Sequence, residues 1–270
     1  MNNLSNDIKK QIGLSSASFY PDIYTEDSIS LMKKLDFNIG EVFLNTPREY
    51  EDDFINKLKY ESQRNNFYIN SVHAFSSSFE PYLFDSYKRR KEDMLIPFKK
   101  ICKAAKNLGA KCYTFHGLRL DKGKEIRLKS IIDVYDEIIY IALSEGIKLA
   151  QENVSWCMSA DIYFLEQLLE RCKYPINFTF DIKQAYKAKI APELYLDIMG
   201  DKVINFHIND NDSNNMCLLP GKGNINYVEI YKKLKKIDYN GVYIIEVYRD
   251  NYINYKEITE AKRHLEKIFI

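Results

Sequence analysis

Eight short apolar runs recur along the whole chain, and they constrain its fold more than any other feature. Each run is rich in β-branched and aromatic residues, and its apolar content is nearly continuous, as in parallel strands that are covered on both faces. The runs occupy residues 11–17, 38–45, 67–74, 111–117, 147–154, 176–181, 203–209 and 241–248. A parallel sheet with helices in the crossovers is therefore expected.

Amphipathic helical patterns fill the gaps between these runs. Apolar residues fall at helical spacing over 128–142, and Gly146 follows at a position where a helix C-cap favours glycine. The same spacing extends over 95–108 and again over 258–268, which predicts a final helix. Thr46 and the proline after it predict the N-cap and first residue of another helix.

Eight strands alternating with eight helices predict one (β/α)₈ barrel domain over residues 1–270. About 250 residues is a common length for this fold, and no Pro/Gly-rich linker or change of composition divides the chain. A doubly wound open sheet is the alternative, but the first turn lacks the GxGxxG pattern that marks many such sheets. In a barrel the carboxyl ends of all the strands would meet at one mouth.

Composition and charge argue against several classes of function. The net charge is +1, which gives no basic field for nucleic acid. No apolar stretch approaches the roughly 18 residues of a membrane span, and the first residues, MNNLSNDIKKQ, lack a signal-peptide core. The five cysteines are odd in number and form no CxxC pair, which favours reduced thiols. We therefore expect a soluble cytoplasmic protein with no membrane partner, and a nucleic-acid partner is disfavoured.

Residues that can bind a metal stand at or just past the ends of the last four runs. They are Glu152, Asp181, His207 and Glu246. Taken singly, Asp181 could be a helix N-cap and either glutamate could pair with a lysine. Charge at the tip of a buried strand is costly unless something pairs with it, and all four tips would share one mouth. Three carboxylates and an imidazole suit one divalent ion, such as Mn²⁺, Mg²⁺, Co²⁺ or Zn²⁺.

Three further polar residues belong to the same predicted mouth. His73 and His116 lie in the third and fourth runs, close to their ends, and Glu41 lies in the second run. Two interpretations of the histidines stay open: a satisfied hydrogen bond in the upper barrel, or contact with a substrate or a second ion. Glu41 is expected to contact a substrate hydroxyl or a lysine. Phe75 and Trp156 offer an apolar wall for a bound ligand or, equally, core packing.

These residues, with their flanking segments, make the chain similar to the xylose-isomerase-like barrels. That superfamily contains sugar and sugar-phosphate isomerases and epimerases, and also abasic-site endonucleases. The matching segments are SVHAF, YTFHG, AQENVS, FTFDIKQAY, FHINDND, LLPGKGNINY and GVYIIEVY. The resemblance implies a metal-dependent proton transfer next to the carbonyl of a small sugar, keto-sugar or sugar phosphate. A homo-oligomer is expected by analogy alone.

The resemblance also implies roles for individual residues. Glu152 and Glu246 would touch the metal and act as the acid/base pair, while Asp181 and His207 would mainly hold the ion. His207 needs a partner for its second ring nitrogen, and Asp210 is the candidate. The residues expected to line the substrate pocket are His73, His116, Glu41 and Gln184.

Three departures from the family pattern bear on the substrate. Gln184 stands where a histidine often follows the strand-six aspartate, Ser213 where some epimerases have an arginine, and Cys217 where a histidine often precedes the PGxG turn. An abasic-site endonuclease would need extra metal ligands, and Gln184, Asn215 and Cys217 suit that use poorly, so DNA cleavage is the weaker alternative. A degenerate barrel that binds a small ligand without turnover is a third hypothesis.

Overall fold

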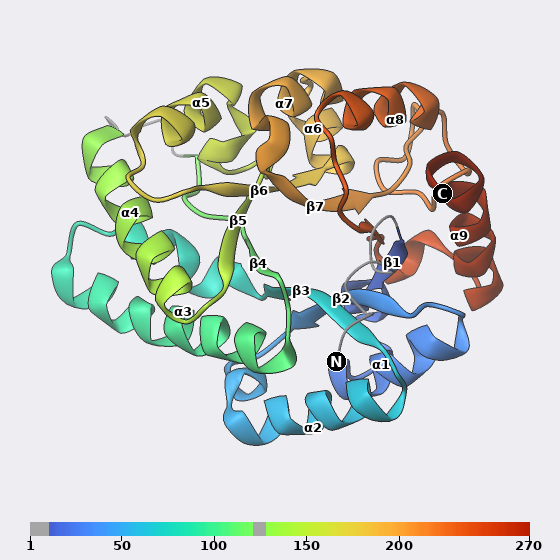
Figure 1. The fold of residues 1–270 in the computed structure, drawn as a ribbon, viewed down its shortest axis with the longest axis horizontal. Coiled ribbons are helices and arrows are strands. Elements are labelled where there is room, and N and C mark those ends of the chain that lie inside the picture. The colour runs from blue at the N-terminus through green and yellow to red at the C-terminus, as the bar shows by residue number, and fades with distance from the viewer. Residues whose placement is uncertain (1–10, 121–127) are drawn as a thin grey trace.

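Every one of the eight apolar runs forms a strand of one closed parallel barrel. The computed structural model describes residues 11–120 and 128–270 (Figure 1). The strands are β1 (Ile12–Ser15), β2 (Ile39–Leu44), β3 (Tyr68–Ala74), β4 (Cys112–Phe115), β5 (Lys148–Glu152), β6 (Asn177–Asp181), β7 (Val203–Ile208) and β8 (Tyr243–Ile245). Neighbours in the barrel are neighbours in the sequence, and β8 pairs with β1 to close the sheet. The predicted barrel is confirmed.

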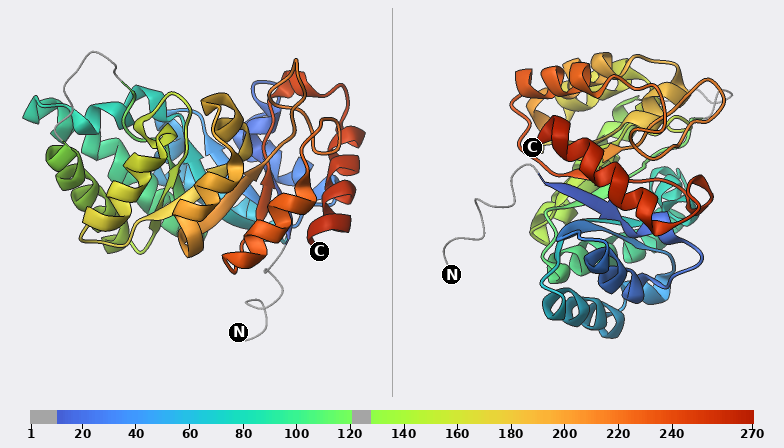
Figure 2. Two further views of the ribbon diagram at one scale, coloured as in Figure 1. Left: turned by 90° about the horizontal axis from the view of Figure 1, so that it is seen from above. Right: turned by 90° about the vertical axis from the view of Figure 1, so that its right-hand side faces the viewer.

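In the described part of the chain, nine α-helices surround the strands, one more than predicted (Figure 2). They are α1 (Thr25–Lys34), α2 (Asp52–Arg64), α3 (Lys88–Leu108), α4 (Leu128–Ser144), α5 (Ile162–Arg171), α6 (Ile182–Ala188), α7 (Pro192–Met199), α8 (Tyr227–Lys236) and α9 (Tyr255–Phe269). The extra helix arises between β6 and β7. There α6 ends at Ala188, the next residue Lys189 has φ +59°, and Pro192 begins α7. Because proline fits the first turn of a helix but disfavours helical conformation in the residue before it, it divides this crossover.

The helix ends follow the predicted pattern with one exception. Gly146 has φ +77° just past the end of α4, as its position predicted. The prediction for Thr46 is wrong in part, because the following proline starts a 3-10 turn, Pro47–Tyr50, and α2 begins only afterwards. The Thr46 side chain forms no capping hydrogen bond. The Glu49 carboxylate instead accepts a hydrogen bond from the Asn45 amide, at 2.7 Å.

The inside of the barrel is apolar near the amino ends of the strands and polar above. Ile39, Val242 and Ile244 form a small apolar cluster at the amino ends, separate from the main core between strands and helices. Above it lies a polar layer in which the Glu41 carboxylate is fully buried and accepts a hydrogen bond from Ser71 Oγ at 2.7 Å. A buried carboxylate is stable only with such partners, so this layer is built to hold a charge.

Strand alternation carries this interior pattern up to the mouth of the barrel. Side chains two residues apart on a strand point to the same face. Asn205 lies in the polar layer and donates to Glu41 Oε2, and His207 lies one step higher on the same strand. On β8, Ile244 of the apolar cluster is likewise followed at the same parity by Glu246. The ends of the strands thus deliver polar side chains to a common central space.

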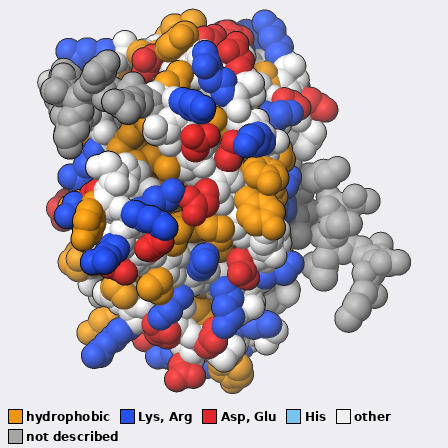
Figure 3. Space-filling view, turned by 90° about the vertical axis from the view of Figure 1, so that its left-hand side faces the viewer, with side chains coloured by type: hydrophobic (Ala, Val, Ile, Leu, Met, Phe, Trp, Pro, Cys, Tyr) orange, Lys and Arg blue, Asp and Glu red, His pale blue; other side chains and the backbone are white. Residues whose placement is uncertain are grey.

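The outer surface carries charges of both signs. Figure 3 shows the face of α3 and α4, where Lys and Arg side chains are interspersed with Asp and Glu and with small hydrophobic groups. One example is the ion pair between Lys103 of α3 and Asp52 of α2, at 2.8 Å. No field of one sign covers this face, in agreement with the net charge of +1. Within residues 11–120 and 128–270, no helix is long and apolar enough to cross a bilayer.

Candidate metal centre

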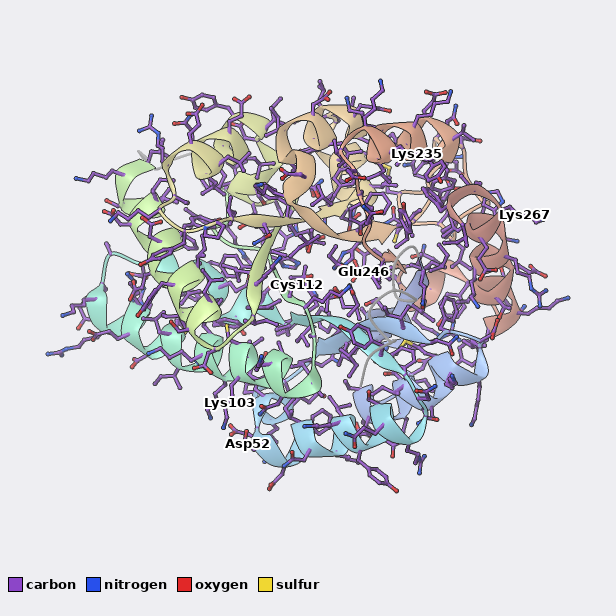
Figure 4. All side chains as sticks on the ribbon, in the orientation of Figure 1. Asp52, Lys103, Cys112, Lys235, Glu246 and Lys267 are labelled. Atoms are coloured by element: carbon purple, nitrogen blue, oxygen red, sulfur yellow. The ribbon has the colours of Figure 1, made fainter. Side chains whose placement is uncertain are left out.

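The four predicted metal ligands converge inside the carboxyl end of the barrel. One donor atom from each residue lies within 4.8 Å of the others. The four residues are Glu152, Asp181, His207 and Glu246. Figure 4 shows Glu246 inside the ring of strands, whereas Lys235 and Lys267 lie on outer helices. None of the four is more than 9% exposed, so their charges have little access to water.

Asp181 has two roles that the sequence had presented as alternatives. It is the last residue of β6, and its Oδ1 accepts a hydrogen bond from the Gln184 amide at 3.3 Å, so it caps α6. Its second oxygen, Oδ2, faces the cluster. The side chain of Asn153 holds the Asp181 backbone on both sides, at 2.7 Å to the amide and 3.0 Å to the carbonyl. The cap fixes one carboxylate oxygen and leaves the other for the centre.

The donor set fits a divalent cation because several of its buried atoms have ion-pair contacts but no hydrogen-bond partner of good geometry among the described residues. In the described part of the chain, Asp181 Oδ2, His207 Nδ1 and Glu152 Oε2 have no hydrogen-bond partner of good geometry. Buried polar atoms left unsatisfied are rare and costly in native proteins. Three carboxylates and one imidazole around one point are a ligand set that Mn²⁺, Mg²⁺, Co²⁺ and Zn²⁺ accept. These residues would hold one such ion.

Glu41 orients His207 from below the cluster. His207 Nε2 lies 3.1 Å from each oxygen of the Glu41 carboxylate, which leaves Nδ1 to face Glu246 Oε2 at 3.2 Å. Besides the bond from Ser71, Glu41 Oε2 accepts bonds from Thr114 Oγ1 at 3.1 Å and Asn205 Nδ2 at 3.0 Å. A carboxylate bonded to the ring nitrogen that does not bind the metal fixes the tautomer of a ligating histidine and raises its basicity.

The predicted partnership between Asp210 and His207 is wrong. The Asp210 carboxylate instead accepts hydrogen bonds from the backbone amides of Gly221, Gly223 and Ile225, at 2.9, 3.0 and 3.0 Å. A carboxylate aimed at several backbone amides is strongly stabilised by them, and here it ties the long β7–α8 connection together. An added Cβ at Gly223 would lie 2.4 Å from Asp210 Oδ1, so only glycine allows this approach.

His73 and His116 extend the cluster on the side of Glu152. Their Nε2 atoms lie 2.8 Å apart, and Glu152 Oε2 lies 3.0 Å from His116 Nε2 and 3.7 Å from His73 Nε2. The other nitrogen of His116 is 2.6 Å from Ser76 Oγ. The histidine pair and Glu152 form a second group whose donor atoms are close enough to hold an ion. Both interpretations of the histidines, polar contact in the upper barrel and contact with substrate or ion, therefore stay open.

The remaining pocket candidates are Gln184 and two aromatic residues, of which Trp156 contacts His116. Gln184 Oε1 accepts hydrogen bonds from the Ser155 amide at 3.0 Å and from Ser155 Oγ at 2.8 Å. The Trp156 ring meets the His116 ring edge-on at 5.4 Å and remains 41% exposed. Phe75 is 51% exposed at the end of β3. Two aromatic side chains thus lie partly open beside the polar cluster.

A family model described as the xylose isomerase-like TIM barrel matches residues 29–268. The chain belongs to that family. The uncharacterized protein MJ1311 of Methanocaldococcus jannaschii is 37% identical over 117 residues, a match that spans 41% of this chain and 40% of that relative.

Solved structures of sugar epimerases share the fold of this xylose isomerase-like barrel. A D-tagatose 3-epimerase-like protein aligns with a TM-score of 0.80 at 22% identity, over 96% of both chains. D-allulose 3-epimerase of Methylomonas sp. gives 0.80 at 15% identity, over 97% of this chain and 98% of that one. D-psicose 3-epimerase of Clostridium cellulolyticum H10 gives 0.77 at 16% identity, over 96% and 99%. At these identities the likeness concerns the fold.

Lys183 is a member of the cluster that the sequence interpretation missed. Its Nζ lies 3.3 Å from Asp181 Oδ2 and 3.5 Å from Glu246 Oε2, and the residue is 3% exposed. Its one sequence signal is its place in the first turn of α6, where a cation opposes the helix dipole. In a chain with 39 lysines and arginines, that signal does not stand out.

Glu80 was also missed, and it supports the end of β4 from outside. Its Oε2 accepts hydrogen bonds from the backbone amides of His116 at 2.8 Å and Gly117 at 3.0 Å, and Tyr113 donates its hydroxyl to Oε1. Burial raises the pKa of Glu80 from its ordinary value of 4.5 to about 7, although the charge of His116 and these hydrogen bonds oppose the shift.

The charges of the cluster move the pKa values of its members in opposite directions. Burial favours the neutral carboxyl at Glu152 and Glu246, yet neighbouring cationic groups outweigh it and lower both pKa values; the nearest are His116 for Glu152 and His207 for Glu246. For Asp181 burial prevails and raises the pKa, against the attraction of Lys183. Burial would lower the pKa of His207, but Glu246 and Glu41 raise it well above its usual value. Such opposed shifts are typical of functional sites.

Proposed function

We propose that this barrel is a divalent-metal-dependent epimerase or isomerase that moves a proton next to the carbonyl of a small, uncharged keto-sugar. One observation carries the proposal: four donor atoms from β5, β6, β7 and the end of β8 lie within 4.8 Å of one another, and several have no hydrogen-bond partner among the described residues. The structural neighbours named as sugar epimerases support the same class of chemistry. The carboxyl end of such a barrel is where its enzymes carry their active sites.

An ion held by this cluster would polarise the substrate carbonyl and stabilise the negative charge that develops on its oxygen. Glu152 and Glu246 would remove and return the proton. Each has one carboxylate oxygen near His207 Nδ1 and a second oxygen in contact with another side chain. Glu152 Oε1 lies 3.7 Å from His207 Nδ1, while its Oε2 meets the histidine pair. Glu246 Oε2 lies 3.2 Å from the same nitrogen, while its Oε1 is 3.4 Å from Ser15 Oγ. Anchoring of this kind positions a carboxylate for proton transfer.

The pocket around the reacting carbon would be lined on the side of β3 to β6. His73, His116 and Gln184 supply polar contacts there, and Trp156 offers an apolar face for the sugar ring. We assign Glu41 a different role from the substrate contact expected from sequence. Because its carboxylate already meets His207 and three hydrogen-bond donors in the polar layer, it acts through His207.

An uncharged sugar is favoured over a sugar phosphate by the cations near the mouth. Lys222, in the loop after β7, is the residue that a phosphate at this place in a barrel would use. Its Nζ is 3.9 Å from Glu257 Oε2, so a carboxylate already lies beside it. Lys183 is likewise paired with two carboxylates. Both lysines thus have carboxylates beside them, which disfavours a phosphate group at these two places.

Solvent isotope exchange tests the proposal directly. The purified full chain is freed of metal with a chelator, reloaded with Mn²⁺, Mg²⁺, Co²⁺ or Zn²⁺, and incubated in D₂O with D-tagatose, D-psicose and D-fructose. We expect metal-dependent deuterium incorporation at the carbon next to the carbonyl, followed by NMR, together with a new ketose or aldose. Glu152→Gln and Glu246→Gln should abolish exchange, whereas Glu229→Gln on exposed α8 should retain it. Undiminished exchange in Glu246→Gln contradicts the proposed role.

A metal-dependent phosphodiesterase acting at abasic sites is the second candidate. The group formed by His73, His116 and Glu152 favours it, because hydrolysis of this kind uses more than one ion. The positions that would complete such a cluster fit it less well. Asn215 is exposed and bonded to Asp212, and Cys217 Sγ is directed at the backbone oxygen of Glu246. Metal-dependent nicking of a duplex with one abasic site, without ketose exchange, would select this candidate. Loss of both activities would select the binding-only barrel.

A further inference from the structure

Lys183 occupies the place where the expected ion would meet its ligands. The oxygens nearest its ammonium group are Asp181 Oδ2 and Glu246 Oε2, at 3.3 and 3.5 Å. These same two oxygens face His207 Nδ1, at 3.9 and 3.2 Å. A divalent ion coordinated by this donor set would bind the atoms that now neutralise the lysine. The ammonium group and the ion therefore compete for one pair of carboxylates.

Without an ion, the cluster needs such an internal cation. The carboxylates of Glu41, Glu152, Asp181 and Glu246 are all buried in or below it. Uncompensated buried charges of one sign are strongly unfavourable. Lys183 is buried with them, and its aliphatic stem is fixed at the start of α6, immediately after Asp181. The lysine thus stabilises the metal-free form.

When an ion binds, the ammonium group loses its acceptors and needs another. The Tyr248 ring centroid lies 5.0 Å from Lys183 Nζ, close enough for a cation–π contact but not for a hydrogen bond. A buried ammonium group has three protons to donate, so it would take up oxygens of a ligand beside the ion. Sugar hydroxyl and carbonyl oxygens are the acceptors that the proposed substrate brings there.

We propose that Lys183 is an exchangeable cation that anchors the substrate: it pairs with Asp181 and Glu246 in the metal-free protein and with a sugar oxygen once a divalent ion has taken those carboxylates. The second half rests on the proposed function. The ion must then bind first, because the lysine reaches the sugar only after its release. Lys183 also supplies a cation from the start of α6, whereas Ser213, in the loop after β7, supplies none.

Mn²⁺ binding without any sugar tests the exchange. Titration calorimetry compares the metal-free full chain with Lys183→Met and with Lys187→Met. Lys187 is the matched control, because it lies over the same Tyr248 ring at 5.6 Å but is exposed. Removing a positive charge that lies within 3.5 Å of two of the proposed ligands should tighten Mn²⁺ binding at least about tenfold in Lys183→Met. The control should stay within about twofold, as expected for an exposed charge.

Equal or weaker Mn²⁺ binding in Lys183→Met overturns the proposal that Lys183 and the ion compete for the same carboxylates. If that variant does not fold, Lys183→Gln replaces it with the same expected result. A second readout is the rise in melting temperature on addition of Mn²⁺, which should be larger in the neutral variant than in the wild type, because tighter ligand binding stabilises the folded state more. A purely structural lysine would lower the melting temperature and leave the Mn²⁺-induced rise unchanged, which also overturns it.

The anchoring half is tested on the ketose that is turned over in the exchange assay. KM should rise at least about tenfold in Lys183→Met, with a smaller change in kcat, as expected when a binding contact is lost. Lys183→Arg, which keeps the charge, should recover part of that loss. An unchanged KM refutes the anchor. If no ketose is turned over by the wild type, the proposed function fails. The Mn²⁺ titration still tests whether Lys183 competes with the ion.

Discussion

Substitution of Glu41 by glutamine separates two roles for a carboxylate buried inside the barrel. Glutamine keeps the shape and can still accept hydrogen bonds from the neighbouring polar layer, but it carries no charge. His207 Nε2 lies 3.1 Å from both carboxylate oxygens, so Glu41→Gln removes the anion behind the ring that presents Nδ1 to the ion. The loss should therefore appear in metal affinity.

The magnitude follows from the chemistry of this contact. A hydrogen bond to a charged group contributes about 1.5–3 kcal/mol. Converted at about 1.4 kcal/mol per factor of ten, that is roughly 10- to 100-fold in affinity, the range typical when a partner of a ligating histidine is lost. We expect Glu41→Gln to weaken Mn²⁺ binding by this factor.

Calorimetric titration of the metal-free protein with Mn²⁺ at one fixed pH measures the effect. Ser71→Ala is the control, because Ser71 Oγ donates to Glu41 Oε2 at 2.7 Å and is bonded to the carboxylate, not to His207. Its Mn²⁺ affinity should change less than about threefold, since a neutral hydrogen bond contributes less. Unchanged Mn²⁺ affinity in Glu41→Gln, with a raised KM for the sugar, would refute this reasoning and restore the substrate contact first expected from sequence.

Three further predictions concern the supports around the cluster. Asp210→Ala should lower the free energy of unfolding by about 3 kcal/mol in urea, because backbone amides of the β7–α8 loop lose a charged acceptor; a change below about 1 kcal/mol would contradict that role. The raised pKa of Glu80, about 7 against an ordinary 4.5, means that folding takes up a proton between these values. Stability should therefore fall by up to about 3 kcal/mol as the pH rises from 4.5 to 7, and Glu80→Gln should remove this part of the slope; parallel wild-type and variant curves would exclude it. Gly117→Ala should cost at least about 1–2 kcal/mol in thermal unfolding, because Gly117 has φ +81° and the added Cβ would lie 2.8 Å from Tyr135 Oη; an unaltered melting temperature would show that the loop relaxes freely.

The strands and the convergence of the four candidate ligands could be predicted from sequence, because both depend on the order of elements along the chain. Each strand lies inside its predicted run, since short continuous apolar segments bounded by polar turns are typical of buried strands. Asp181, at the end of β6, and Glu152, at the end of β5, come together because parallel strands of a barrel finish at one rim. That inference needed the order of the strands and nothing about side-chain conformation.

The supports of the site could not be predicted because they depend on register across the barrel. Glu41 of β2 meets His207 of β7, and the depth at which they meet is set by how far neighbouring strands are shifted along one another. The proximity of Asp210 to His207 in the sequence predicts a contact between them, but the Asp210 carboxylate instead accepts hydrogen bonds from backbone amides of the β7–α8 loop. A lysine such as Lys183 carries no mark that separates it from its exposed neighbours until its surroundings are known.

His207 contacts Glu41 through Nε2 and the proposed ligand Glu246 through Nδ1. The two halves of the barrel therefore contribute different parts of the candidate site. All four ligands come from the half that begins at β5, whereas Glu41 and the histidine pair come from the half that ends with β4. A fragment made of the second half would contain all four proposed ligands but would lack Glu41, the carboxylate that orients the His207 ring. Under the proposed function, substitution of His73 or His116 in the first half would change the choice of sugar and leave the proposed metal ligands of the second half in place.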